Sequence, residues 1–304
     1  MNNYRKGIYF ALITAIVSGV AVFISSFATK VVKDPFVLTT LRNVIVAIWL
    51  SAVLIGISSW QSIKQLTFKQ WSQLILIGLI GGSIPFLLFF KGLSLSTASG
   101  GALIHKTLFI WVGILAVIFL KEKTGKLQIF ALIILLAGNY LLSVPKSWNF
   151  GLGEILVFIA VLFWAVETII AKVVLKNIPA VILAWGRMFF GSIIMLGFLF
   201  FTDRFSIIST LNSNQWLWII LPCLLLFSYV ILWYNSLKYS PASLVTSILV
   251  LGSLVTTLLS SIFIIHKYQL SQIISYLLLI IGIVLFIKFL PRTKNVQNRQ
   301  LTVR

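Results

Sequence analysis

Five charged or titratable side chains lie deep inside long apolar stretches of this 304-residue sequence: Arg42, His105, Lys106, Glu167 and Arg187. An ionisable group in an apolar, membrane-like interior costs about 3 kcal/mol on insertion scales, so each of them is a candidate functional residue. A carboxylate and an imidazole are suited to relaying protons, whereas ammonium and guanidinium groups attract anions. These residue types therefore indicate proton transfer and the recognition of a negatively charged group.

The sequence lacks the patterns of several other chemistries. No Asp lies within an apolar stretch, no Cys/His cluster has metal-ligand spacing, and the single cysteine, Cys223, cannot form an intrachain disulfide. There is no glycine-rich phosphate-binding loop of the kind that ATPases use. We expect no metal site, no cofactor and no catalytic residues, and ATP-driven transport by this chain alone is excluded.

The composition identifies the class of protein that must position these residues. Hydrophobic residues make up 60% of the chain and charged residues only 10%, with a mean hydropathy of +1.09, whereas soluble proteins are about one quarter charged. The net charge of +19 comes from 24 Lys and Arg against 5 Asp and Glu. Because the basic residues stand singly between apolar runs, they do not indicate nucleic-acid binding. The chain is predicted to be an all-α, polytopic membrane protein in a lipid bilayer.

Ten segments are long enough to cross the bilayer, since a transmembrane helix needs about 20 mainly apolar residues. Pro85 and Pro222 lie inside two of them, where a missing N–H frees a backbone carbonyl that can line a cavity. The ten predicted transmembrane helices cover residues 7–28, 35–58, 71–91, 98–120, 126–144, 151–174, 179–201, 216–237, 241–264 and 270–290.

The distribution of Lys and Arg predicts the orientation of these helices. Fifteen of the 24 basic residues fall on the side of the N-terminus, six on the opposite side and three inside predicted helices. Cytoplasmic loops carry the excess of positive charge. We therefore expect a multi-pass protein of the cell (plasma) membrane with both termini in the cytoplasm. Residues 291–304 are predicted to form a basic, disordered cytoplasmic tail.

The two halves of the chain align with each other. A shift of 144 residues pairs residues 93–99 with 237–243, and it also pairs Lys123 with Lys267, Gln128 with Gln272 and Gly138 with Gly282. This predicts one five-helix repeat over residues 1–145 and a second over 146–290. Because five is odd, the second repeat enters the membrane inverted. Inverted repeats are typical of secondary transporters, which bind substrate near the midplane between the repeats and work by alternating access.

Several motifs mark this duplication: a Pro followed by an Arg at the start of the second and seventh helices, a Ser-rich junction, a basic-acidic-basic turn after the fourth helix, a glycine in the fifth and tenth, and a Trp-small pair. The residues are Pro35, Arg42, Pro179, Arg187, 92–99, 236–243, 120–123, Gly138, Gly282 and Trp164-Ala165. On these features the whole chain resembles the drug/metabolite transporter superfamily, specifically its EamA-type exporters with ten helices in two repeats. His266 stands where the second repeat commonly has Glu, and Ser18-Gly19 replaces Trp-Gly. The motifs identify the superfamily and leave the substrate open.

Depth along the helices predicts which ionisable groups meet. At about 1.5 Å per residue, Glu167 lies roughly 7 Å from the cytoplasmic end of its helix and Arg187 roughly 12 Å from the cytoplasmic face. We predict that these two pair directly or through water. Glu167 and Lys106 differ by about 10 Å in depth, so direct contact between them is not expected.

The outer half of the membrane then holds three groups with no intramembrane acid: Arg42, His105 and Lys106. A water-filled, cation-lined vestibule for an anionic or zwitterionic solute would explain them, with Trp164 and Trp111 stacking on the substrate. We assign substrate binding to His105, Lys106, Trp164 and Trp111. The alternative is that Lys106 and Arg42 extend along their helices to the outer face.

The roles of the other ionisable residues are predicted by comparing each one with its counterpart in the other half of the chain. Glu167 and His105 have no charged counterpart in the other half, so they are the candidates for proton coupling. Arg42 and Arg187 recur in both halves, which favours a structural or gating role. For Glu167, a purely structural ion pair is the alternative.

The sequence thus predicts a secondary active transporter that exports a small metabolite, such as an amino acid, and not an enzyme. Its expected partners are that small-molecule substrate, the bilayer and, as a candidate coupling ion, the proton, but no nucleic acid; the chain acts as a monomer or a homodimer. Two alternatives stay open. One is an integral-membrane lipid-modifying enzyme that uses His105 and Glu167, and the other is a non-transporting membrane scaffold.

Overall fold

The computed structural model describes residues 3–56, 60–96, 98–142, 151–266 and 269–289, and no β-strand occurs among them. The predicted tail at 291–304 lies outside these residues. The first half contains α1 (Asn3–Val31), α2 (Pro35–Gly56), α3 (Trp60–Lys64), α4 (Phe68–Gly82), α5 (Ile84–Leu95), α6 (Ala98–Lys106), α7 (Leu108–Leu120) and α8 (Lys126–Leu142). The second contains α9 (Leu152–Val174), α10 (Ala180–Phe201), α11 (Ser206–Ser209), α12 (Ser213–Tyr239), α13 (Ala242–Leu249), α14 (Leu251–Ser260), the π-helix η1 (Ser261–Ile265) and α15 (Leu270–Lys288).

Nine of the ten predicted membrane spans are confirmed as helical segments that are long and apolar enough to cross a bilayer, within the described ranges. The remaining predicted span corresponds to the shorter apolar helix α8, of 17 residues. Three spans consist of two helices each: α4 with α5, α6 with α7, and α13 with α14. The predicted all-α fold of two five-helix repeats is therefore the fold of the chain.

Two of the interrupted spans break within one residue of equivalent places in the two repeats. The backbone N–H groups of Thr107 and Ile110 donate to carbonyls three residues earlier, at Ile104 and Thr107. The N–H groups of Val250 and Ser253 likewise donate to Ser247 and Val250. These tighter i to i−3 bonds interrupt the α-helical ladder, as short 3₁₀ turns do. The break is therefore a repeated feature of the fold.

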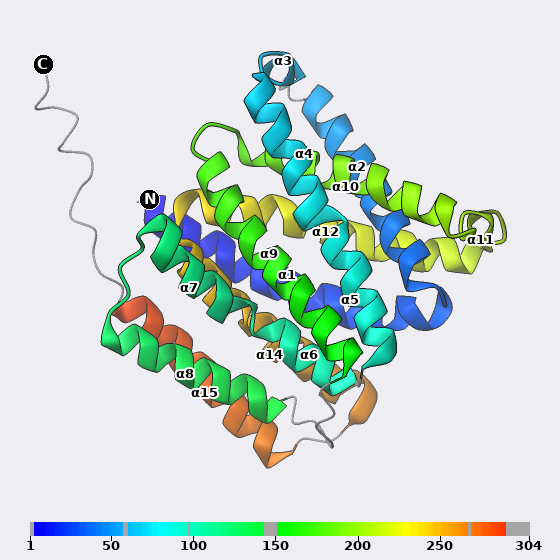
Figure 1. Cartoon of the computed structure of the whole chain (residues 1–304). Coiled ribbons are helices and arrows are strands. Elements are labelled where there is room, and N and C mark those ends of the chain that lie inside the picture. Colours follow the sequence, from blue (N-terminus) through cyan, green and yellow to red (C-terminus); the bar gives the residue numbers. More distant parts are fainter. Residues whose placement is uncertain (1–2, 57–59, 97, 143–150, 267–268, 290–304) are drawn as a thin grey trace, which may run out of the picture.

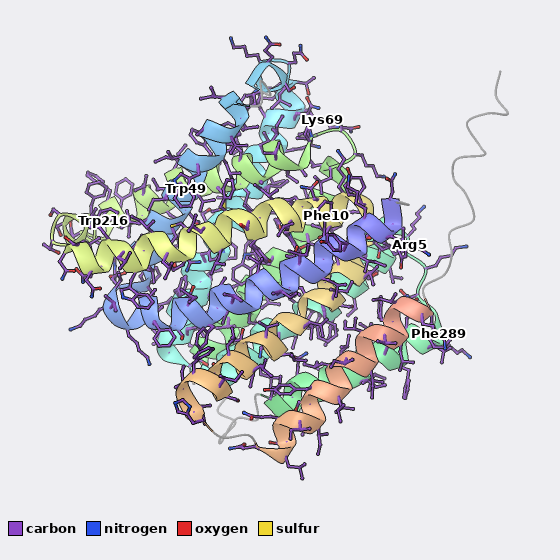
Figure 2. The ribbon with its side chains drawn as sticks, turned by 180° about the vertical axis from the view of Figure 1, so that it is seen from behind. Arg5, Phe10, Trp49, Lys69, Trp216 and Phe289 are labelled. Carbon is purple, nitrogen blue, oxygen red and sulfur yellow. The ribbon has the colours of Figure 1, made fainter. Side chains whose placement is uncertain are left out.

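Helices of one repeat pack against helices of the other in a symmetric pattern. The first helix of each repeat meets the third span of the other: α1 packs along α12, and α9 packs along α5. The last helices, α8 and α15, pack together, as do α2 and α10. In Figure 2, α1 crosses the middle of the molecule between α12 and α14. The core thus lies between the repeats.

Two glycines permit the closest of these approaches. A Cβ added to Gly7 would lie 2.1 Å from Ser240 Oγ, and one added to Gly153 would lie 2.7 Å from the backbone N of Ser96. Gly7 corresponds to Gly153, and Ser240 to Ser96, in the alignment of the repeats. Only a residue without a Cβ fits at either position.

The molecule has two faces, which we name by their contents. The terminal face holds the start of α1, the end of α15 and α3, and the distal face holds residues 32–34, which join α1 to α2, together with α11 (Figure 1). In Figure 2, Arg5 and Phe289 accordingly lie at one end of the molecule and Trp216 at the other. Because both described ends lie on one face, the number of crossings is even.

Candidate functional site

The interruption between α4 and α5 frees one backbone carbonyl in the interior. Pro85 has no N–H, so the carbonyl of Gly81, four residues earlier, has no helical donor. The Gly81 oxygen instead accepts hydrogen bonds from Trp164 Nε1 and Arg187 Nη2, each at 3.1 Å. Ser83, at the break, donates its hydroxyl to Gly78 and Leu79. A carbonyl of the first repeat is thus bound by two side chains of the second.

Glu167 and Arg187 lie on either side of the same glycine. A Cβ at Gly81 would be 2.5 Å from Glu167 Cγ and 3.4 Å from Arg187 Nε. The Tyr234 hydroxyl donates a 2.6 Å hydrogen bond to Glu167 Oε1 and also lies beside the Arg187 guanidinium. We call Gly81, Trp164, Glu167, Arg187 and Tyr234 the Gly81 cluster. Glu167, at 2% exposure, and Tyr234, at 0%, are closed off from solvent.

The predicted proximity of Glu167 and Arg187 takes an indirect form. Between residues that the structure describes, the one salt bridge joins Asp34 and Arg204, so Glu167 and Arg187 form no direct ion pair. Arg187 Nε has no hydrogen-bond partner. The two groups interact electrostatically across Gly81 and Tyr234.

His105 lies against aromatic rings. Its ring centroid is 5.0 Å from that of Phe89 and 5.3 Å from that of Trp164, and the Trp164 ring is 5.2 Å from Phe86. We call these four residues the aromatic cluster. Trp164 belongs to both clusters, so it connects His105 to the Gly81 carbonyl and to Glu167.

Lys106 ends α6, directly before the break at Thr107. Thr107 donates its hydroxyl to the Ile104 carbonyl at 2.7 Å and accepts a 3.1 Å bond from Trp111 Nε1. The Trp111 ring meets Phe158 edge-on at 5.2 Å. Lys106 itself is partly exposed and has no hydrogen-bond or ion-pair partner in the described part of the chain. It is a cation available to a ligand.

Arg42 lies apart from both clusters. Its Nη1 donates to Ser25 Oγ at 3.3 Å, which ties α2 to α1, and its Nε is buried without a partner. The next residue, Asn43, donates its side-chain amide to the Gly82 carbonyl at 3.1 Å. The start of α2 is therefore linked to the same helix break by Asn43 and not by Arg42.

Several members of these clusters were not predicted from the sequence. Phe86, Phe89 and Tyr234 gave no signal, because an aromatic residue in an apolar span usually packs in the core. Gly81 could have been found, since it lies four residues before Pro85 and its carbonyl had to be free. Trp164 was identified, but its N–H bond to a backbone carbonyl was not expected.

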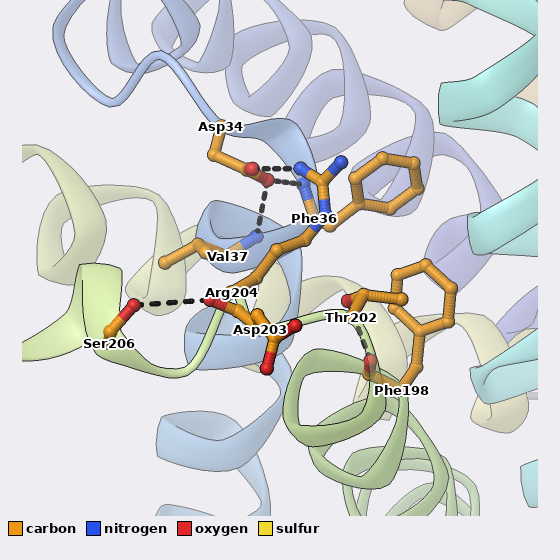
Figure 3. A network of polar contacts seen from close by, with 8 residues as sticks. All are labelled: Asp34, Phe36, Val37, Phe198, Thr202, Asp203, Arg204 and Ser206. Carbon is orange, nitrogen blue, oxygen red and sulfur yellow. Dashed lines mark hydrogen bonds and ion pairs between the residues drawn. The ribbon is translucent and has the colours of Figure 1, made fainter.

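Polar contacts join helices on both faces of the molecule. On the terminal face, Glu122 accepts hydrogen bonds from the backbone N–H groups of Ala242 and Ser243, at 2.7 and 3.2 Å, and caps the start of α13. Lys172 donates to the Leu237 carbonyl and, at 2.7 Å, to that of Ser240. On the distal face, the Asp34–Arg204 salt bridge joins the α1–α2 connection to the end of α10 (Figure 3).

Two cavities open toward these faces. One of about 720 Å³ lies on the distal face between the α1–α2 connection, α5 and α10, and one of about 310 Å³ lies near the terminal face between α4, α7 and α9. Neither is lined by His105 or Lys106.

A family model now accounts for this architecture. The model of the EamA-like transporter family matches residues 5–144 and again residues 151–288. The chain belongs to the EamA-like transporter family. The two matches correspond to the two repeats, and they support a membrane transporter of the drug/metabolite type.

Relatives of this EamA-like chain agree with the family. An uncharacterized transporter of Synechocystis sp. is 27% identical over 270 residues, which cover 82% of this chain and 74% of the relative. An uncharacterized transporter in the cobO 3' region of Sinorhizobium sp. is 30% identical over 137 residues, 44% of this chain and 89% of the relative. The family and these names point to a transporter rather than an enzyme.

A solved structure shares the fold. The crystal structure of a protein that is 14% identical superposes with a TM-score of 0.78 over 94% of this chain and 98% of that chain. At this level of identity the match concerns the arrangement of the EamA-like helices alone.

Proposed function

We propose that this EamA-like protein is a secondary active transporter that exports a small anionic or zwitterionic metabolite, such as an amino acid, by alternating access. The observation that carries the proposal is the unpartnered ammonium group of Lys106 at a helix break, next to the aromatic cluster around His105. A cation without a counter-ion in an apolar interior is stabilised when an anionic ligand supplies one.

Different residues would bind the charged part and the apolar part of such a substrate. Lys106 attracts the carboxylate, and His105 hydrogen-bonds to it from the end of the same helix. The rings of Trp164 and Trp111 provide apolar surface for the rest of the substrate. The broken helices α6–α7 and α13–α14 supply the irregular backbone that substrate sites of inverted-repeat transporters use.

Alternating access then requires the two faces to open in turn. The Glu122 cap of α13 joins the two repeats at the terminal face, and the Asp34–Arg204 salt bridge joins them at the distal face. In the proposed cycle one of these contacts breaks while the other holds. Arg187 and Arg42 keep structural or gating roles, because each ties α10 or α2 to a neighbouring helix.

Proton coupling is assigned to Glu167 and His105. Glu167 is buried with Tyr234 as hydrogen-bond donor, so it exchanges protons only in a conformation that opens the Gly81 cluster. His105 is less completely buried than Glu167. The excess of basic residues on the terminal face supports placing that face, with both termini, in the cytoplasm of a cell with this protein in its plasma membrane.

The test is uptake by the full chain in liposomes, with labelled amino acids, nucleosides and organic anions and with or without a pH gradient. Lys106→Gln is expected to lower uptake of the anionic or zwitterionic substrate about tenfold or more, since it removes a charged contact. Lys30→Gln, which removes the same charge from an exposed distal position, is the matched control. Uptake of cations alone, unaffected by Lys106→Gln, overturns the substrate class.

The coupling assignment has its own pair of variants. Glu167→Gln is expected to abolish the dependence of uptake on the pH gradient while leaving exchange of substrate. Tyr234→Phe removes the hydrogen bond but leaves the carboxylate, so the gradient dependence should persist. If Glu167→Gln retains the full dependence, Glu167 is structural; the same test then applies to His105→Gln.

A further inference from the structure

The 720 Å³ cavity on the distal face combines charge with apolar surface. Its basic side chains are Lys33, from the α1–α2 connection, Lys91, from α5, and Arg204, which follows α10. Its apolar wall is formed by Leu87, Leu88 and Phe198. We call this cavity the distal cleft.

The acidic side chain in the cleft is already neutralised. Asp34 Oδ1 accepts hydrogen bonds from the backbone N–H groups of Phe36 and Val37, at 2.9 and 3.1 Å, and so caps the start of α2. Its other oxygen forms the salt bridge with Arg204, and the Arg204 guanidinium lies over the Phe36 ring at 4.9 Å (Figure 3). Asp34 and Arg204 therefore satisfy each other.

Two positive charges remain. Lys33 and Lys91 are both exposed, and neither ammonium group has a hydrogen-bond or ion-pair partner among the described residues. They lie on different elements and line one cavity, so an anion between them would be attracted by both. The charge of the cleft thus calls for a ligand with a negative group.

The apolar wall distinguishes between kinds of anion. Leu87 and Leu88 lie on α5, four and three residues before Lys91, and continue the cleft from the lysines toward the interior of the membrane. Phe198, which packs against Phe36 at 5.3 Å between ring centroids, forms the opposite wall. A free inorganic ion would use the lysines but leave this wall uncovered. An amphiphile uses both parts.

We propose that the distal cleft binds an anionic phospholipid, with the head-group phosphate between Lys33 and Lys91 and an acyl chain along Leu87, Leu88 and Phe198. Lysine side chains at the ends of membrane helices lie at the level of lipid head groups, which places the two ammonium groups where the phosphate is. The site shares no residue with the proposed substrate site, but Asp34 and Arg204, the distal contact of the proposed cycle, border it, so the test measures lipid binding and not transport.

The test measures lipid binding to the full chain in detergent micelles by native mass spectrometry. Phosphatidylglycerol is expected to bind about tenfold more tightly than phosphatidylcholine, because two lysines act on its net negative head group. In the Lys33→Gln/Lys91→Gln double variant this preference should disappear. Lys30→Gln removes a charge from the same face but outside the cleft, and should retain the preference.

Competition with inorganic phosphate separates a lipid from a free anion. Phosphate at millimolar concentration should leave the bound phosphatidylglycerol in place, because it cannot cover the apolar wall. Displacement by phosphate overturns the lipid assignment. Equal binding of the two lipids, or an equal loss of the preference in Lys30→Gln, overturns the site. Thermal unfolding without added lipid checks that the variants are folded.

Discussion

Replacing Gly81 by alanine tests whether the Gly81 cluster is as closely packed as its geometry indicates. The new Cβ would lie 2.5 Å from Glu167 Cγ and 3.0 Å from Glu167 Cδ. The neighbour is a side chain, so Glu167 must move. Its movement strains the hydrogen bond that it accepts from Tyr234.

The expected loss of stability follows from three contributions. Overpacking in a close-packed interior costs about 1–3 kcal/mol. Weakening a buried hydrogen bond to a charged group costs about 1.5–3 kcal/mol, while alanine gains up to about 1 kcal/mol over glycine in a helix. We expect Gly81→Ala to destabilise the protein by about 2–4 kcal/mol in total.

The measurement is unfolding of the purified protein in detergent, compared with Gly197→Ala. Gly197 lies on α10, the helix of Arg187, and a Cβ there would meet nothing within 4 Å, so its replacement should be neutral or slightly stabilising. Glu167→Ala removes the atoms that clash and should reduce the cost of Gly81→Ala by at least about 1 kcal/mol in a double-mutant cycle. Equal stability of the Gly81 and Gly197 variants would refute the packing argument.

Three further predictions concern contacts between the repeats. Gly153→Ala should cost more than Gly81→Ala in the same unfolding assay, because its Cβ would lie 2.7 Å from backbone atoms, which cannot turn away; a smaller cost would contradict this order. Asp34→Asn should lower the free energy of unfolding by no more than about 1 kcal/mol, since Arg204 is 37% exposed and solvent screens the ion pair. A double-mutant cycle with Arg204→Gln measures the coupling energy of the pair. A coupling energy above about 2 kcal/mol would contradict the screening by solvent. Glu122→Gln should weaken the cap of α13 by about 1–2 kcal/mol and speed hydrogen exchange at the start of that helix; unchanged exchange there would mean that the cap contributes nothing.

The membrane spans could be predicted from the sequence because length and apolarity alone determine them. The same holds for the two repeats, since residues such as Gln128 and Gln272 match in one fixed register. The breaks at Thr107 and Val250 could not be predicted. No proline or glycine occupies either position, and Gly252, inside the second turn, has no counterpart in the first, so no shared local signal marks where the ladder of hydrogen bonds changes.

The sequence predicts how deep each site residue lies in the membrane, but not the direction in which its side chain faces around the helix axis. Counting residues along the helices correctly placed Glu167 near Arg187, on either side of Gly81. Depth alone does not determine which neighbouring helix a side chain faces, so Tyr234 on α12 was not predicted as the hydrogen-bond partner of Glu167. It also could not foresee that the Trp164 ring would meet His105 while its N–H bonds to Gly81.

The acceptor that joins the two repeats at the helix break is a backbone oxygen, and this has a genetic consequence. No substitution at position 81 can delete that oxygen, so a point mutation removes one of its two hydrogen bonds only by changing a donor, Trp164 or Arg187, and competes with them only through Pro85. Any other residue at position 85 would reintroduce an N–H that competes for the same oxygen. Mutations of Pro85, Trp164 and Arg187, which are far apart in the sequence, should therefore produce one shared phenotype. A second mutation that suppresses one of these defects is to be sought at the other two positions.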